Sequence, residues 1–135
     1  MNDIPEGFAT LSRTSPYTEL LGPIYQKTEA SGLVVGLRIE NRHCNARGLA
    51  HGGVFGTLAD IAMGYAAAFS TEPPTPMVTA SQTMDYVGKA EQGDWVEVHT
   101  DVHKVGRSMA FAGCRFYVGS RCIATASAVF SVVTA

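Results

Sequence analysis

The sequence predicts an α+β fold in which a curved antiparallel β-sheet wraps around one long central helix. Residues 52–70 are almost all apolar or small and are rich in Ala, Leu and Met, which favours a helix over a strand. The chain after residue 76 reads instead as strands separated by turns. Because a helix that is apolar nearly all round must be buried nearly all round, the sheet is expected to enclose it.

The elements before the long helix are short. Residues 15–22 are expected to form a helix that is capped by Ser15 and stopped by a Gly-Pro pair. Residues 24–40 are expected to form two extended segments around a turn at Ser31–Gly32, and the second segment has the period of a half-buried strand. Residues 41–51 are polar and irregular, so they predict a loop.

The elements after the long helix are predicted to be strands. Three prolines, at 73, 74 and 76, end the helix. Apolar alternation and intervening glycines then predict a meander of three to four strands, at 77–87, 94–105, 108–118 and 121–133.

The composition fits a single domain spanning residues 1–135. Charged residues make up 16% of the chain and the formal net charge is -2, with no long basic run. This argues against nucleic acid or an anionic membrane as the main partner, and the low charge content favours an oligomer. A cytoplasmic protein is expected, because the N-terminus lacks a secretory pattern and the three cysteines contain no CxxC pair.

Asp60 is the one charged residue in the middle of the apolar helix. Burying an unpaired carboxylate costs free energy, so Asp60 must have a partner or a use. Gly56 and Gly64 lie one turn before and one turn after it, although helix-interior glycine costs about 1 kcal/mol relative to alanine. The glycines indicate that a second backbone or a narrow ligand approaches this face. The alternative is a structural acid that accepts hydrogen bonds from Thr57 or from a neighbouring strand.

The start of the same helix is the second candidate feature. The first N–H groups of a helix have no partner inside it and carry a partial positive charge, and Gly52 and Gly53 leave them unshielded. Such a terminus can polarise a carbonyl oxygen, with His51 and Asn45 nearby. The alternatives are a tight turn at the glycines and a helix-entry histidine whose side chain is satisfied by the backbone.

A distance argument connects the two features. Gly52 and Asp60 are separated by roughly 12 Å along the helix axis, at about 1.5 Å per residue. One carbonyl cannot contact both groups of a single helix. If both act on one substrate, a two-fold dimer must bring the helix start of one chain to the helix middle of the other.

Two other catalytic patterns are not expected. His99 and His103 in the segment HTDVH resemble a metal-binding pair, but no third ligand of the CxxC or HExxH type is evident. On the expected strand they share a solvated or interface face, opposite Val96 and Val98. The sequence contains no GxSxG motif, which argues against a Ser/His/Asp catalytic triad of the kind that this motif carries. No metal and no cofactor are therefore expected.

The segment from Asn45 to Asp60, NARGLAHGGVFGTLAD, closely resembles the signature of the hotdog-fold acyl-CoA thioesterases. The most similar branch contains the phenylacetate-pathway (PaaI-like) thioesterases and their mammalian relatives, whose Asn–x5–His-Gly-Gly–x6–Asp spacing is matched here. The stretch KVGRSMAF at 104–111 is also similar, so the resemblance covers most of residues 20–133. The motif is specific for the fold and the enzyme class and says little about the substrate.

The resemblance implies a thioester hydrolase that forms homodimers, often paired into homotetramers, with two active sites at each dimer interface. It implies that Asp60 is the general base or the nucleophile and that the amide of Gly52 polarises the thioester carbonyl. Asn45 would help to hold the lytic water and His51 would lie beside the thioester. Asn45, His51 and Gly52 would come from one chain, and Asp60 would come from the other.

The resemblance also implies an assisting hydroxyl and a site for the substrate. Thr79, from the chain that supplies Asp60, is the candidate hydroxyl, with Ser81 as the alternative. Met63 and Tyr65 are candidates for the acyl pocket. Coenzyme A is part of the substrate and carries phosphates, so polar residues in or beside the predicted turns are candidates to bind it: Lys89, Lys104, Arg107 and Ser108.

The sequence therefore predicts an acyl-CoA thioesterase acting on a short-chain or aryl acyl group. Another enzyme of the same fold, an acyl-thioester dehydratase, is an alternative, although that class pairs its helix acid with a histidine in a different motif. A non-catalytic module that binds acyl-CoA without turnover is the second alternative.

Overall fold

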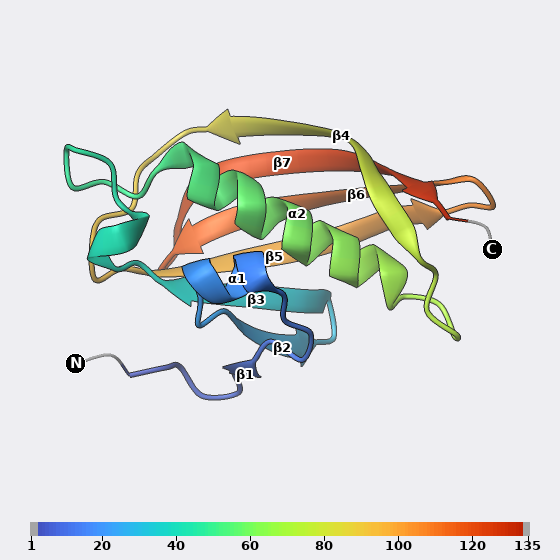
Figure 1. Ribbon diagram of the computed structural model, residues 1–135, viewed down its shortest axis with the longest axis horizontal. Coiled ribbons are helices and arrows are strands. Elements are labelled where there is room, and N and C mark those ends of the chain that lie inside the picture. Colours follow the sequence, from blue (N-terminus) through green and yellow to red (C-terminus); the bar gives the residue numbers. More distant parts are fainter. Residues whose placement is uncertain (1–2, 134–135) are drawn as a thin grey trace.

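The long helix α2 (Gly52–Ala68) crosses one face of a curved, seven-stranded antiparallel sheet in the computed structural model, which describes residues 3–133 (Figure 1). The strands follow one another across the sheet in the order β1-β2-β3-β5-β6-β7-β4. Their bounds are β1 (Ala9–Thr10), β2 (Tyr25–Glu29), β3 (Gly32–Arg38), β4 (Met77–Tyr86), β5 (Trp95–Val105), β6 (Met109–Val118) and β7 (Arg121–Val132). The predicted fold class, one long helix against a curved antiparallel sheet, is confirmed.

The short helix α1 (Pro16–Leu21) lies beside α2 and forms as its sequence predicts. Ser15 caps it, because its side chain accepts a hydrogen bond from the N–H of Thr18 while the Thr18 hydroxyl accepts one from the N–H of Ser15. The loop before α2 contains a short 3₁₀ helix, η1 (Asn41–His43), which the sequence reading missed. Strand β1 was also missed, since two residues are too few to show a period.

The core lies between α2 and the sheet. The helix contacts β3, β4, β5, β6 and β7, and its buried face carries Phe55, Leu58 and Met63. Cys114 faces the same core from β6, and burial raises the pKa of its thiol to about 12.

The expectation that α2 is buried nearly all round is wrong for the single chain. A stripe on its other face, formed by Gly53, Gly56, Thr57, Asp60 and Gly64, remains partly or fully exposed. These positions recur every three or four residues, so they share the side of the helix that points away from the sheet. The buried apolar residues of α2 occupy only the remaining sides of the helix.

Strand β4 forms one edge of the sheet, where it pairs with β7. Its register shifts between Thr79 and Ser81, so Ala80 is an extra residue in a β-bulge, and the strand bends along its length in Figure 1. The bulge reverses which side chains face the helix, and this decides the geometry of the site described below.

None of the helices within residues 3–133 combines the length and the hydropathy needed to cross a bilayer.

Candidate active site

A groove of about 880 Å³ runs along the exposed stripe of α2. Residues of α1 and of the segment before it line the groove on one side, and the first half of β4 lines it on the other. The floor contains the small residues Gly53, Gly56 and Gly64, which keep the space above the helix open. Asp60 lies among them and is partly exposed, so its own chain does not enclose the carboxylate.

The structure brings Thr79 and Asp60 together. The Thr79 hydroxyl donates a short hydrogen bond to Oδ1 of Asp60. Side chains two residues apart on a regular strand share a face, but the bulge at Ala80 separates Thr79 from Ser81. Ser81 instead lines a small pocket with His103 and Phe111 on the opposite face of the sheet. The alternative that Ser81 assists Asp60 is therefore wrong in this geometry.

Two further side chains of β4 contact α2, and no pattern in the sequence pointed to either. Gln82 donates from Nε2 to the carbonyl oxygen of Gly56 at 3.0 Å. The hydroxyl of Tyr86 donates to the carbonyl oxygen of Gly52 at 2.7 Å. With the Thr79–Asp60 bond, they link β4 to three successive turns of the helix. These pairings depend on the register of β4 against α2, which only the folded structure supplies.

The start of α2 has the geometry of a carbonyl-binding terminus. His51 is the N-cap, and its Nδ1 accepts a hydrogen bond of 2.9 Å from the N–H of Gly53. This leaves Nε2 as the protonated nitrogen of the neutral ring. The N–H of Gly52 has no acceptor among residues 3–133. The ring of Tyr86 lies 3.3 Å from the place where a Cβ of residue 52 would be.

Asn45 is exposed in the turn that leads to this helix. Its Oδ1 accepts hydrogen bonds from the N–H groups of Arg47 and Leu49, at 2.9 and 3.2 Å. Gly48 has a positive φ of 78°, which closes the turn. The turn therefore fixes Asn45 through its oxygen and leaves its amide nitrogen without a partner among the described residues.

Gly52 and Asp60 remain far apart within one chain. Because α2 is a continuous helix, the two residues are separated by about 12 Å along its axis. The structure therefore brings together Asp60 with Thr79, and His51 with Gly52, but not one pair with the other.

The candidate residues for coenzyme A fall at opposite ends of the sheet. Lys89 follows β4 near the start of α2, and its ammonium group lies 3.7 Å from a carboxylate oxygen of Glu91. Lys104, Arg107 and Ser108 are at the hairpin between β5 and β6, at the end of the sheet where β4 begins. They do not form one cluster with Lys89 in a single chain.

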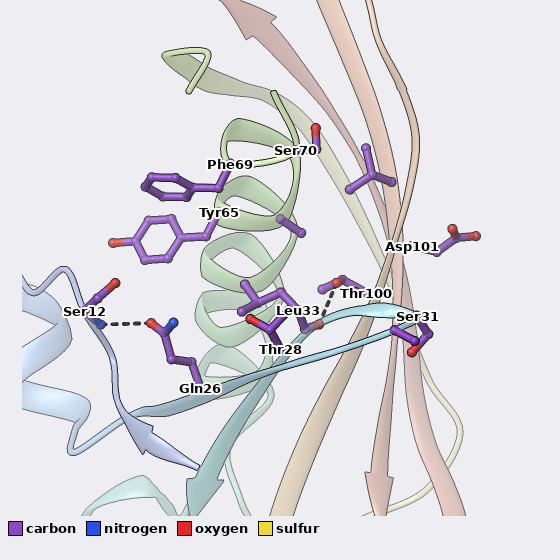
Figure 2. Close-up of a pocket in the computed structure, with 14 residues that line it drawn as sticks. Ser12, Gln26, Thr28, Ser31, Leu33, Tyr65, Phe69, Ser70, Thr100 and Asp101 are labelled. Atoms are coloured by element: carbon purple, nitrogen blue, oxygen red, sulfur yellow. Dashed lines mark hydrogen bonds between the residues drawn. The ribbon is translucent and has the colours of Figure 1, made fainter. Parts of the chain in front are cut away.

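The two candidates for the acyl pocket also separate. Met63 is fully buried in the core and does not line the groove, so its assignment is corrected. Tyr65 lines both the groove and a neighbouring pocket of about 530 Å³. Figure 2 shows Tyr65 and Phe69 projecting side by side from the last turns of α2, opposite Ser12 and Gln26. The two aromatic rings, with centroids 6.1 Å apart, therefore stand between the groove and this pocket.

The two histidines of the HTDVH segment have carboxylate neighbours on their own strand. Nε2 of His99 lies 3.0 Å from Glu97, and Nδ1 of His103 lies 3.5 Å from Asp101. The buried residues Val96 and Val98 alternate with this row. His99 therefore lies on the face of the sheet that is turned away from α2 and from the groove.

Comparisons with known proteins agree with this architecture. The family model described as "Thioesterase superfamily" matches residues 47–123, which is more than half of the chain. A Pseudomonas aeruginosa protein named "Putative esterase PA0474" is 53% identical over 131 residues, covering 96% of this chain and 98% of that protein. Human acyl-coenzyme A thioesterase 13 is 29% identical over 107 residues, covering 78% of this chain and 76% of its own.

A solved structure extends the comparison to three dimensions. A mutant of the phenylacetic acid degradation protein PaaI from Thermus thermophilus superimposes with a TM-score of 0.75 and 26% identity. The match covers 88% of this chain and all of the PaaI chain. The matched family segment contains the helix start, Asp60 and Thr79, whereas the side of the groove formed by α1 and the segment before it lies outside the matched residues.

Proposed function

This chain belongs to the thioesterase superfamily and is a thioester hydrolase, and on that premise we propose that it hydrolyses a short-chain or aryl acyl-CoA to the free acid and coenzyme A. The observation that carries the proposal is the carboxylate of Asp60, which lies in an open groove with the hydroxyl of Thr79 bound to one of its oxygens.

Asp60 is proposed to supply the attack on the thioester. The Thr79 hydroxyl binds Oδ1, and Oδ2 has no hydrogen-bond partner among residues 3–133, so Oδ2 is the oxygen proposed to react. As a general base, Oδ2 takes a proton from a water whose oxygen attacks the carbonyl carbon, and the coenzyme A thiolate leaves. As a nucleophile, Oδ2 attacks the carbonyl carbon itself, the thiolate leaves, and water hydrolyses the resulting mixed anhydride. Thr79 orients the carboxylate in both cases.

Gly52 is proposed to stabilise the charge that develops on the carbonyl oxygen. Its N–H has no partner among residues 3–133, and it points outward from the positive end of α2. One such donor is worth about 3–4 kcal/mol of transition-state stabilisation in other enzymes. His51 would lie beside the thioester, and the free amide nitrogen of Asn45 would hold the water.

Two chains are proposed to form each site. Three features of the single chain support this: the distance of about 12 Å between Gly52 and Asp60, the exposed stripe of small residues on α2, and the unpaired outer side of β4. Antiparallel packing of two α2 helices would place Asp60 of each chain opposite the helix start of the other. It would also bring the Lys89 end of one sheet near the Lys104 end of the second copy.

The acyl group is proposed to extend from Asp60 towards Tyr65. The groove continues along α2 to Tyr65 and Phe69, which also line the neighbouring pocket. Their aromatic rings offer an apolar surface on which a small aliphatic or aryl group can pack. Gly64, which has no side chain, lies between Asp60 and these rings in the lining of the groove.

The test is release of free thiol from a panel of short aliphatic, long aliphatic and aryl acyl-CoAs. The wild type, Asp60→Asn and Asp85→Asn are compared. Asp85 is an exposed aspartate on the same strand as Thr79, two residues from Thr83, which faces the opposite side of the sheet. We expect turnover by the wild type and by Asp85→Asn, and a loss of at least about a hundred-fold in kcat for Asp60→Asn.

Two outcomes would contradict the proposal. Near-wild-type turnover by a folded Asp60→Asn variant would remove Asp60 from the mechanism. Binding of acyl-CoA by the wild type without turnover of any member of the panel would favour the non-catalytic binding module instead.

A further inference from the structure

Two of the residues that line the groove carry a formal charge: Asp60 and Arg13. Arg13 lies in the segment before α1, and Asp60 lies on α2, so the two charges come from different elements. An anionic substrate approaching Asp60 would be repelled by the carboxylate, and the guanidinium of Arg13 is the lining group that can offset this repulsion.

In the part of the chain that the structure describes, the side chain of Arg13 has no polar partner, whereas five of the other lysine and arginine side chains are paired. Within residues 3–133 it makes no salt bridge and no hydrogen bond through its side chain. Lys27, Arg42 and Lys89 are paired with carboxylates, whereas Arg38 and Arg121 donate to backbone carbonyl groups. The remaining cations without such partners in the described chain, Arg47, Lys104, Arg107 and Arg115, do not line the groove.

The backbone on both sides of Arg13 is fixed. The N–H of Leu11 donates to the carbonyl oxygen of Ile24 at 2.8 Å, and that of Ser12 donates to Oε1 of Gln26 at 2.9 Å, a bond drawn in Figure 2. On the other side, Ser15 begins the capping box of α1. Arg13 is therefore presented from an anchored segment, which lowers the entropy lost when its side chain binds a ligand.

Arg13 is also placed towards the end of the groove where the acyl group is proposed to lie. Ser12, the residue before it, lines the pocket that contains Tyr65 and Phe69. Tyr17, which follows on α1, hydrogen-bonds through its hydroxyl to Thr57 at 2.9 Å. The segment thus follows α2 from Thr57 towards Tyr65, past the turn that carries Asp60.

We propose that Arg13 binds an anionic group of the thioester substrate and thereby determines which substrates this groove accepts. A guanidinium presents a planar fork of donors that matches a carboxylate or a phosphate. The anion is either a carboxylate at the far end of the acyl group or a phosphate of coenzyme A. The proposal rests on the thioesterase function above and adds a specificity-determining residue to it.

The experiment separates the two sources of charge with four substrates. Butyryl and glutaryl thioesters differ by a terminal carboxylate, and each is made both with coenzyme A and with N-acetylcysteamine, which has no phosphate. The values of KM and kcat are measured for the wild type, Arg13→Gln, Arg13→Lys and Arg115→Gln. Arg115 is the matched control, since it is an exposed arginine on β6 that does not line the groove.

The expected result is a selective rise in KM for Arg13→Gln, by roughly three- to ten-fold, that shrinks at high salt. A rise for both glutaryl thioesters identifies the acyl carboxylate, and a rise for both coenzyme A thioesters identifies the phosphate. Arg13→Lys should recover part of the effect, and Arg115→Gln should show none. The butyryl ester of N-acetylcysteamine, which has no anionic group, should keep its KM in every variant.

Two results would overturn the proposal: an unchanged KM for all four substrates, or an equal rise for the uncharged one, which would indicate a structural role. Failure of the proposed function would be recognised separately, because the wild type would then release thiol from none of the four compounds. In that case the compounds remain intact, and their Kd values for the wild type and Arg13→Gln, measured by calorimetry, test Arg13 on the same criteria.

Discussion

At the scale of single residues, the site depends on one extra residue in a strand. The bulge at Ala80 turns Thr79 towards Asp60 and leaves Ser81 on the opposite face of the sheet. A hydrogen bond to a carboxylate is stronger than one between neutral groups, and it fixes which oxygen is free. Thr79 is therefore expected to orient Asp60, while Ser81 is expected to have no part in the reaction.

Replacing Thr79 and Ser81 in turn tests this difference. Thr79→Ala is expected to lower kcat by roughly ten- to hundred-fold, because a charge-assisted bond is worth about 1.5–3 kcal/mol, whereas Thr79→Ser should retain most activity. Ser81→Ala is the matched control and should leave kcat unchanged. Steady-state thiol release measures all three variants, and equal losses for Thr79→Ala and Ser81→Ala would show that the bulge does not select between them.

At the scale of elements, the N-terminal segment that carries Arg13 is attached to the sheet through Trp95. The ring of Trp95 lies on Gly36 of β3, where a Cβ would be only 2.3 Å from a ring carbon. Phe8 packs edge-on against the same ring, with 5.1 Å between the two ring centroids. The guanidinium carbon of Arg38 lies 5.2 Å from the centroid of the Trp95 ring. The close approach of strand and ring therefore requires glycine at position 36.

Gly36→Ala is expected to destabilise the fold by about 1–3 kcal/mol, because the ring must move to admit the methyl group. Chemical denaturation measures the change in the free energy of unfolding. In a Trp95→Leu background, which lacks the ring, the same substitution should cost much less. An equal cost in both backgrounds would show that the contact with Trp95 is not what excludes a side chain at position 36.

The elements could largely be predicted from the sequence, because their signals are local. Apolar spacing, the three prolines and the turn glycines located α2 and the strands after it, and the Ser15 cap located α1. The bulge at Ala80 could not be predicted, since one inserted residue leaves the composition of the strand unchanged. The exposed stripe of α2 was predicted only around Asp60, because glycines elsewhere in the helix count as apolar, although they leave space instead of filling it.

The candidate site could be predicted only in part. Asp60 was found because it interrupts an apolar helix, and Gly52 because glycines follow a polar loop. The contacts of Gln82 and Tyr86 with α2 could not be predicted, because they join residues far apart in the chain. Arg13 was missed because its role as a lining residue depends on how the segment before α1 lies along the groove.

At the scale of the whole molecule, the single chain carries the two halves of the proposed site far apart. Asp60 and Gly52 lie on one helix, about 12 Å apart, with Thr79 of β4 beside Asp60 and the N-cap His51 beside Gly52. The exposed face of α2 and the outer side of β4 offer a second copy both a helix surface and a strand edge. If both halves act on one substrate, each dimer must therefore contain two sites, and each site must combine residues of both chains.

Mixing two inactive variants tests this requirement most directly. Asp60→Asn removes the acid, and Gly52→Pro removes the N–H while proline remains tolerated in the first turn of a helix. Gly52→Ala keeps the N–H and adds a Cβ against Tyr86, so it controls for the steric effect of residue 52. The variants are refolded together, and hybrid dimers are isolated through two different affinity tags before thiol release is measured.

Each hybrid dimer is expected to regain one intact site, so its activity should reach about half that of a wild-type dimer. Each parent variant alone should remain inactive, and Gly52→Ala should retain clear activity. Hybrid dimers that form but remain as inactive as their parents would contradict a site shared between two chains.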